Sequence, residues 1–302
     1  MRNQTENRRR RKRKRAPHYL LAGVALIVLL LAAGLAVAKE QRKKTEEANL
    51  PLTSGITEAP TAGETRIKMP PRTAGTLFLV NANFGLDPAY QPGKIVQASK
   101  ESARRGISLP LIDNSIRLSE FLFPHAAELY AYAAENGNGE CFVSSGYRDF
   151  DEQQEIYDGQ TPEELAKGLA AKPGHSEHQS GLGVDISFTS QHVMDNAWRC
   201  GFILRYPENK SEITGIMYEP WHFRYVGKPY AELIAGEGLC LEELPGFLRD
   251  KGSYSFESEE GGRYLLGYAD PDEDGMLTIP EEFLGCEVSP CGSGAVLLIA
   301  QD

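Results

Sequence analysis

A stretch of twenty residues without a charged side chain, residues 19–38, constrains this chain more than any other feature. Twenty helical residues rise about 30 Å, which is the thickness of the hydrocarbon core of a bilayer. Nine Lys and Arg residues precede the stretch, eight of them in the unbroken run 8–15. Because the larger positive cluster stays in the cytoplasm, the pattern predicts a basic cytoplasmic tail at 1–18, a single-pass anchor in the cell membrane at 19–38, and an extracytoplasmic body.

The same stretch has an alternative interpretation as a cleaved signal peptide. Ala36, Val37 and Ala38 fit a small-x-small cleavage pattern. The apolar stretch is longer than the usual signal-peptide core of about 7–15 residues, which favours an anchor that is kept. Both interpretations export the body.

Charge is distributed unevenly between the beginning of the chain and the rest. Residues 1–48 contain 13 Lys and Arg against 4 Asp and Glu, and the remaining residues contain 19 against 38. Neutralising phosphates requires a basic face, so the acidic body is not expected to bind nucleic acid. Apolar content of 41% is ordinary for a globular protein.

Composition also divides the exported part. Residues 39–75 are charged at first and then rich in Pro, Thr, Gly and Ala, which predicts a flexible stalk. Residues 76–244 mix helical and strand patterns without a regular βαβ rhythm, which favours an α+β domain. Residues 245–302 contain Gly-punctuated strand patterns and predict a small β-rich C-terminal region.

Periodicity and turn residues predict the individual elements of the body. Helices are expected at 119–135, 149–157 and 161–171. Strands are expected at 76–80, 141–143, 184–188, 222–226, 263–269, 276–279 and 295–300.

The five cysteines have no CxxC spacing, which argues against a cysteine zinc site. Cys141, Cys200 and Cys240 are interpreted as small buried hydrophobic residues. Cys286 and Cys291 are close enough in sequence for a disulfide in an oxidising compartment.

Three short segments carry residues suited to metal chemistry: 145–148, 173–185 and 219–222. A catalytic zinc site takes three ligands from His, Asp and Glu and leaves a fourth position open, and His178, Asp185 and His222 offer such a set. Spacing alone does not decide which residues bind the metal, because His175 is a rival ligand.

Two further side chains in these segments suit catalysis. Glu219, three residues before His222, can act as a proton acceptor beside the metal. Arg148 has the fork geometry that suits an oxyanion or a carboxylate.

The three segments together resemble the VanY-type D-alanyl-D-alanine carboxypeptidases, a zinc peptidase family that also includes the VanX-type dipeptidases. The pattern of that family is Ser-Gly-Tyr-Arg, then Ser-x-His-x-x-Gly-x-Ala-x-Asp, then Glu-x-Trp-His. This chain matches it from Ser145, Ser176 and Glu219. Gly183 replaces the usual Ala. The resemblance covers residues 77–243.

The resemblance implies that His178, Asp185 and His222 bind one zinc ion per chain and that Glu219 is the catalytic base. It also implies that Arg148 holds the oxyanion. The expected substrate is a peptidoglycan stem peptide ending in D-Ala-D-Ala.

Ser176 and Gln153 are candidates for binding the substrate. A turn residue is the alternative for Ser176, and a solvated helix face is the alternative for Gln153.

The chain is expected to act as a monomer.

Three other functions stay open at this point. An L,D-carboxypeptidase acting on tetrapeptide stems uses the same ligands. A wall-binding or sensor module on the same fold needs no base, and the presence of Glu219 speaks against it. An endopeptidase that cuts cross-bridges requires an open groove.

Residues 270–281 fit the spacing of an EF-hand calcium loop, from Asp270 through Gly275 to Glu281. The flanking segments are strand patterns and Pro280 precedes the last ligand position. We therefore expect an acidic turn between two strands and no calcium site.

Overall fold

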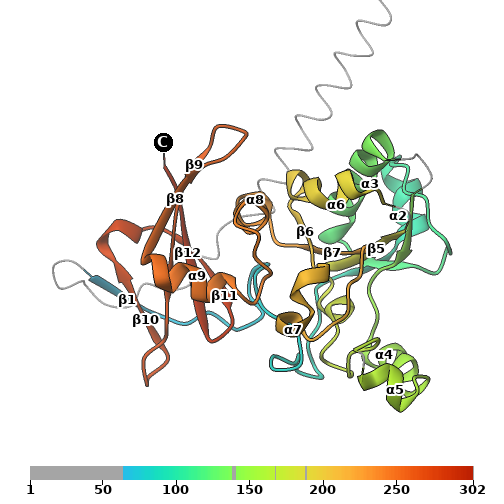
Figure 1. Ribbon diagram of the computed structural model, residues 1–302, viewed down its shortest axis with the longest axis horizontal. Helices are drawn as coiled ribbons and strands as arrows, with labels where there is room; N and C mark the ends of the chain where they lie inside the picture. Colours follow the sequence, from blue (N-terminus) through green and yellow to red (C-terminus); the bar gives the residue numbers. More distant parts are fainter. Residues whose placement is uncertain (1–63, 138–140, 167, 188, 302) are drawn as a thin grey trace, which may run out of the picture. The chain divides into compact units, whose positions relative to one another are not determined.

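The computed structural model describes residues 64–137, 141–166, 168–187 and 189–301 (Figure 1). The predicted tail, the predicted anchor and most of the predicted stalk lie outside these residues. Within the described ranges, every helix is too short or too polar to cross a bilayer.

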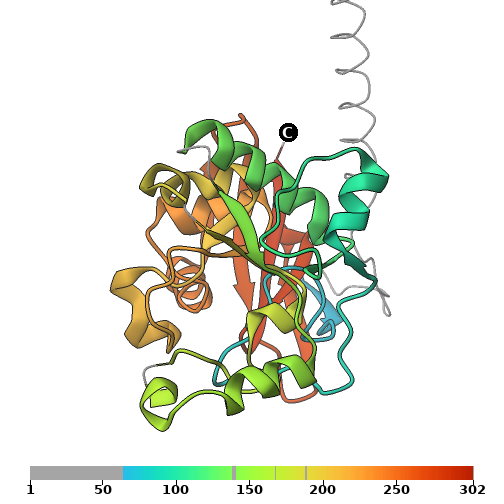
Figure 2. The same cartoon turned by 90° about the vertical axis from the view of Figure 1, so that its right-hand side faces the viewer.

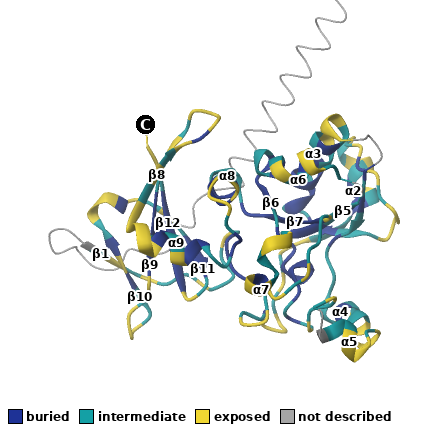
Figure 3. Cartoon of the chain, viewed as in Figure 1, coloured by how far each residue is buried: buried dark blue, intermediate teal, exposed yellow. Residues whose placement is uncertain are grey.

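A four-stranded sheet of order β4-β5-β7-β6 forms the centre of the first region, and all its neighbouring strands run antiparallel. Its strands are β4 (Phe142–Ser145), β5 (Gly183–Ser187), β6 (Phe202–Leu204) and β7 (His222–Tyr225). All four residues of β7 are buried, as expected of a central strand (Figure 3).

Side-chain alternation gives the two faces of this sheet different chemistry. On one face, Val184 of β5 and Phe223 of β7 join the main hydrophobic core. Asp185 follows Val184 and His222 precedes Phe223, so the side chains of Asp185 and His222 point to the opposite face. The alternation therefore separates a packed core from a polar surface within the same strands.

Helices pack on the apolar face. Helix α3 (Leu122–Asn136) buries Leu122, Ala126, Leu129 and Ala133, which recur at helical spacing. The core also includes residues of α2 (Ala98–Arg105), α6 (Gln191–Asn196) and the 3₁₀ helix η2 (Ala197–Cys200).

Helices α4 (Phe150–Asp158) and α5 (Pro162–Ala166) lie at the end of this region remote from α3 (Figure 1, Figure 2). Helix α4 begins with a capping box, in which the side chains of Asp149 and Glu152 each accept the other residue's backbone N–H. The remaining elements are β2 (Ile95–Gln97), β3 (Arg117–Ser119), η1 (Glu177–Ser180), η3 (Glu208–Lys210), α7 (Ser211–Thr214) and α8 (Lys228–Gly236).

The C-terminal region is rich in strands, and a helix that the sequence analysis did not predict opens it. Helix α9 (Leu244–Lys251) packs against a four-stranded sheet of order β11-β12-β9-β8. Its strands are β8 (Ser253–Glu257), β9 (Arg263–Ala269), β11 (Glu287–Cys291) and β12 (Gly294–Gln301), and β10 (Met276–Pro280) and the 3₁₀ helix η4 (Glu281–Phe283) complete the region.

The stalk prediction is wrong for its last residues. Strand β1 (Glu64–Lys68) pairs antiparallel with β10, with Lys68 opposite Met276. Ile67 packs against the cluster that contains Leu277. This short strand gains a sheet partner in β10 and a hydrophobic surface to pack against. The sequence did not predict the strand because the neighbouring residues are rich in Pro and Thr.

The predicted strand at 76–80 is also wrong. Residues 77–80 are buried, but they belong to none of the described strands. Guanidinium groups, in place of a neighbouring strand, bind the carbonyl oxygens of this segment. Arg224 Nη2 donates to the carbonyl oxygens of Thr76 and Phe78 at 2.8 Å. Arg72 Nη1 donates to Leu79 O at 2.9 Å.

The predicted helix at 161–171 ends early, at Ala166. Gly168 has a φ of 72°, a left-handed conformation that terminates helices.

A disulfide between Cys286 and Cys291 is not formed, and all five cysteines are free. Cys286 immediately precedes β11 and Cys291 is its last residue, and five extended residues span about 16 Å. Disulfides require Cα atoms within about 7 Å.

In the segment with EF-hand spacing, residues 270–275 form the turn between β9 and β10, as expected, and β10 itself occupies most of the rest. The Asp272 carboxylate accepts the backbone N–H groups of Asp274 and Met276 and pairs with Arg66. Asp270 pairs with Arg249 at 2.6 Å. These carboxylates organise the turn.

Candidate metal centre

Two of the predicted metal ligands stand directly opposite each other in neighbouring strands. Asp185 of β5 is the register partner of His222 of β7, and Asp185 Oδ1 lies 2.8 Å from His222 Nδ1. The third predicted ligand, His178, comes from η1, and its Nε2 lies 3.4 Å from the same Asp185 oxygen. The structure therefore brings the predicted trio together around one carboxylate.

The orientation of His178 is fixed by its other ring nitrogen. His178 Nδ1 lies 2.7 Å from Gly146 O, a carbonyl that can only accept a proton. Nδ1 therefore carries the hydrogen, and the lone pair of Nε2 points toward Asp185. This is a common arrangement for a metal-binding histidine.

The donor set fits a zinc ion. The candidate ligand atoms of His178, Asp185 and His222 all lie within 4.8 Å of one another, and among the described residues they form the one such cluster. Burial lowers the pKa of His178 to about 4, so it is neutral at pH 7. Burial opposes ionisation of Asp185, but the two histidines outweigh it and hold its pKa well below the usual range.

Glu219 lies beside the trio without joining it. Its Oε2 is 3.8 Å from His222 Nδ1, and a turn that leads into β7 places it, with His222 N–H donating to Glu219 O. Burial raises the pKa of Glu219 above its usual value. A carboxylate whose pKa is shifted toward neutrality suits a proton acceptor.

Arg148 faces the same site. The largest influence on its pKa is burial, which lowers it, and the charges of Asp185 and Glu219 act in the opposite direction. Its buried Nε has no hydrogen-bond partner among the described residues. Asp149, the residue after Arg148, caps α4 and pairs with Arg117.

The predicted residues line one cavity of about 230 Å³. Ser176 and Gln153, the two candidates for binding substrate, are both buried in its wall. The alternative interpretation of Gln153, a side chain on a solvated helix face, is wrong. Its Nε2 donates to Ala171 O at 2.8 Å, while its buried Oε1 has no partner in the described part of the chain.

Several cavity residues were not predicted as site residues. Tyr206 packs against His222 with ring centroids 5.0 Å apart. Leu169, Ile216 and Trp221 add apolar surface. The sequence signal for Leu169 was weak because it follows a helix that ends earlier than expected.

Glu177 was also missed. It is fully buried between Ser176 and His178, and it is paired with Arg205 and Arg224. A signal existed: these arginines lie within apolar strand patterns, and a buried arginine requires a carboxylate partner.

The remaining histidines of the described chain stand apart from the cluster. His175, the rival ligand, has its Nδ1 2.7 Å from Asn81 O. His125 stacks on Tyr225, and His192 contacts Tyr132.

Comparison with known proteins agrees with this geometry. Residues 115–228 match the family described as VanY, D-alanyl-D-alanine carboxypeptidase. A D-alanyl-D-alanine carboxypeptidase of Enterococcus faecium is 34% identical over an alignment of 215 residues, which covers 68% of this chain and 69% of that protein.

Two further relatives extend the comparison. The bifunctional D-Ala-D-Ala dipeptidase and carboxypeptidase VanXYC of Enterococcus gallinarum is 34% identical over 57% of this chain and 95% of its own length. The crystal structure of the vancomycin-resistance D,D-dipeptidase VanXYg, in complex with a D-Ala-D-Ala phosphinate analogue, is 27% identical. It covers 79% of this chain and 98% of that one, with a TM-score of 0.62.

Proposed function

The chain belongs to the VanY family of D-alanyl-D-alanine carboxypeptidases, and from this premise we propose that it removes the terminal D-alanine from peptidoglycan stem peptides. The protein is a zinc metallocarboxypeptidase with one zinc ion per chain. The observation that carries the proposal is the convergence of His178, Asp185, His222 and Glu219 on one cavity.

His178, Asp185 and His222 would hold the zinc ion, and a neutral His178 and an ionised Asp185 suit this role. Zinc supplies Lewis acidity, which polarises the scissile carbonyl and lowers the pKa of a bound water to about 7. Zinc sites of this type leave a fourth position open.

Glu219 accepts a proton from the attacking water and later donates it to the amine of the departing D-alanine. Two observations support this role. The carboxylate lies at the edge of the ligand set, and burial raises its pKa. A base that must also act as an acid works best when its pKa is near the working pH.

Arg148 stabilises the negative charge that develops on the carbonyl oxygen. Its buried Nε has no partner among the described residues, so the guanidinium has donor capacity that a substrate oxygen can use. A preorganised donor of this kind is worth about 3–4 kcal/mol in comparable oxyanion holes.

Ser176 and Gln153 position the peptide. One amide hydrogen of Gln153 is already used by Ala171 O, and its free Oε1 is an acceptor. We therefore assign Gln153 Oε1 to a substrate N–H, and leave the terminal carboxylate to donors such as the Ser176 hydroxyl. This assignment gives the two residues complementary roles.

We further propose that residues 19–38 anchor the protein in the cell membrane, with a cytoplasmic N-terminus and an extracytoplasmic catalytic domain. The uncharged stretch and its flanking basic residues support this topology. Two separate experiments test this topology. Alkaline extraction of membranes should leave the protein in the membrane fraction, and protease treatment of intact protoplasts should digest the catalytic domain. A cleaved signal peptide would release the protein into the medium.

Mass spectrometry of purified stem peptides tests the activity. The pentapeptide ending in D-Ala-D-Ala should lose one D-alanine, and a chelator should abolish the loss. The tetrapeptide should remain intact under the same conditions. Cleavage of the tetrapeptide alone would replace the proposal with an L,D-carboxypeptidase, and cleavage of cross-linked dimers alone with an endopeptidase.

A further inference from the structure

A segment on the N-terminal side of the catalytic domain, residues 72–86, forms neither a helix nor a strand, and we call it the connector. It lies outside the region that matches the family, which begins at residue 115. Three apolar residues of the connector share a hydrophobic cluster with Leu182. The connector therefore packs against the segment 174–182, which carries the proposed metal ligand His178 and Ser176 of the cavity wall.

Two hydrogen bonds join the connector to the beginning of that segment. The backbone N–H of Leu86 donates to Gly174 O at 2.6 Å. The side chain of His175 makes the second bond, with its Nδ1 2.7 Å from Asn81 O. Because a carbonyl oxygen can only accept, Nδ1 of His175 carries the hydrogen. The imidazole of His175 is therefore a donor that ties the segment to the connector.

The backbone of Gly85 packs directly on the ring of His175. A side-chain carbon added at Gly85 would stand 2.7 Å from His175 Cε1 and 2.9 Å from its Nε2, and carbons of this kind essentially never approach another atom within 3.0 Å. The φ angle of Gly85 lies outside the left-handed region, so its backbone conformation does not require glycine. The space that glycine leaves is filled by the imidazole ring.

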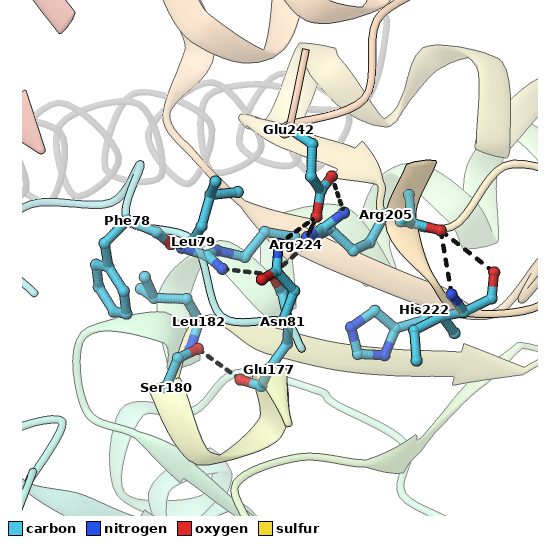
Figure 4. Close-up of polar contacts among 12 residues, drawn as sticks. Phe78, Leu79, Asn81, Glu177, Ser180, Leu182, Arg205, His222, Arg224 and Glu242 are labelled. Atoms are coloured by element: carbon cyan, nitrogen blue, oxygen red, sulfur yellow. Dashed lines mark hydrogen bonds and ion pairs between the residues drawn. The ribbon is translucent and has the colours of Figure 1, made fainter. Parts of the chain in front are cut away.

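The acceptor of this hydrogen bond, Asn81, is itself held in place (Figure 4). Its Oδ1 accepts the backbone N–H groups of the residues two and three positions later, at 2.9 and 3.1 Å. Its Nδ2 donates to Glu242 Oε1 at 2.9 Å, and the Glu242 carboxylate is bound by Arg205 through two hydrogen bonds. The carbonyl that receives the His175 hydrogen is therefore fixed by the core of the protein.

His175 and Ser176 are neighbours whose side chains serve opposite sides of the same backbone. Ser176 has extended backbone angles, with φ −95° and ψ 133°. Successive side chains of an extended backbone point to opposite sides. The side chain of His175 contacts the connector, and Ser176 is buried in the wall of the catalytic cavity. The bond on one side therefore determines where the hydroxyl on the other side lies.

We propose that His175 is a positioning residue that holds the hydroxyl of Ser176 in its place in the cavity wall. This inference rests on the proposed contact between Ser176 and the terminal carboxylate of the substrate, and it names the group that fixes that contact. A donor that is held in place before the substrate arrives loses less conformational freedom on binding. His175 therefore strengthens substrate binding through Ser176 and supplies no ligand to the metal.

The first test measures binding without turnover. Zinc-loaded Glu219→Gln protein is titrated calorimetrically with the dipeptide D-Ala-D-Ala. Adding His175→Ala should raise the dissociation constant about 5- to 10-fold, as should adding Ser176→Ala, with unchanged zinc content. His192→Ala is the matched control, because the ring of His192 contacts Tyr132, and it should bind like the parent. An unchanged dissociation constant in His175→Ala would overturn the proposal.

The second test separates positioning from folding. His175→Asn keeps a nitrogen donor at the position of Nδ1 and should restore most of the affinity, whereas His175→Phe keeps a ring without a donor and should not. Equal losses in the Asn and Phe variants would show that the hydrogen bond plays no part. In protein that already carries Ser176→Ala, His175→Ala should cause no further loss, because the two residues act as one unit. Additive losses would show that His175 does not act through Ser176.

A third variant leaves His175 itself unchanged. Gly85→Ala places a methyl group where the ring lies, so the ring must move away from Asn81 O. This variant should also raise the dissociation constant, and it decides the question if His175→Ala does not fold. Binding as tight as in the parent would contradict the proposal.

Failure of the proposed peptidase activity is a separate result. If the wild-type protein leaves the stem pentapeptide intact while the His175 and Ser176 variants bind the dipeptide more weakly, the activity fails and the positioning role stands. If the pentapeptide is cleaved and His175→Ala binds the dipeptide normally, only the positioning role fails.

Discussion

Asp185 Oδ1 lies within 3.4 Å of ring nitrogens of both His178 and His222, and the Asp185–His222 pair is set by the register of β5 and β7. Sheet hydrogen bonds therefore determine the spacing of two ligands. Glu219 enters the same site through the turn that precedes β7. A site built in this way on strands is held in position by the packing of the whole sheet.

Substituting His222 with Ala should abolish stoichiometric zinc binding, because only two protein ligands remain. Zinc content after dialysis, measured by mass spectrometry of the metal, checks this. His175→Ala is the matched control, since His175 contacts Asn81 outside the cluster. A full equivalent of zinc in His222→Ala would show that the ligand set is wrong.

Glu219→Gln should keep its zinc and lose turnover by about 100-fold or more, because the amide cannot accept the proton. Release of D-alanine under saturating substrate gives kcat, and metal analysis is run on the same sample. The exposed Glu212, substituted in the same way, controls for a change of net charge. A decrease of only a few-fold would indicate another base.

Arg148→Ala should lower kcat by about 100-fold with unchanged zinc content, since it removes the cation facing the oxyanion. Arg148→Lys should recover only part of the rate, because an ammonium lacks the planar fork. Thermal unfolding of the same preparations separates catalysis from structure. Loss of stability with normal kcat would contradict this role.

His125→Phe should make the zinc-free protein more resistant to acid. Burial lowers the pKa of His125 to about 4, from 6.5 for the free side chain. Between these values the unfolded chain binds a proton that the folded chain does not, so stability falls as pH decreases through this window.

The size of this effect follows from the same pKa values. At pH 5 the cost of keeping His125 neutral is about 2 kcal/mol, and at pH 7.5 it is negligible. Urea unfolding of both proteins at the two pH values measures the difference. An equal pH dependence in wild type and His125→Phe would contradict the prediction.

A version of the chain that starts at Leu77 should be less stable than one that starts at Glu64. The shorter version loses β1 and leaves β10 without the partner that covers it. It also loses Arg72, which binds Leu79 O. Unfolding midpoints of the two purified versions test this, and equal midpoints would show that β1 adds nothing.

The metal ligands and the base were predictable because each lies in a short motif of the VanY family pattern, whereas spacing alone left His175 as a rival ligand. Asp185 and His222 also lie in strand patterns, so alternation predicts that Asp185 faces away from Val184 and that His222 faces away from Phe223. What the sequence could not supply was the pairing of β5 with β7, which joins segments far apart in the chain.

The errors have a common physical origin in long-range partners. The segment 76–80 has the composition of a strand, but its carbonyl groups are bound by Arg72 and Arg224, not by a neighbouring strand. Strand β1 was hidden because its partner, β10, lies more than 200 residues later. Local propensity contains no information about either partner.

The pairing behind the metal site also has an evolutionary consequence. Glu177, Arg205 and Arg224 are fully buried, Arg205 also pairs with the largely buried Glu242, and the four charges sum to zero. Losing any one of them leaves a buried charge uncompensated, which costs several kcal/mol. Substitutions at these positions should therefore be fixed in pairs of opposite sign, and homologues that lack Glu177 should also lack one of the two arginines.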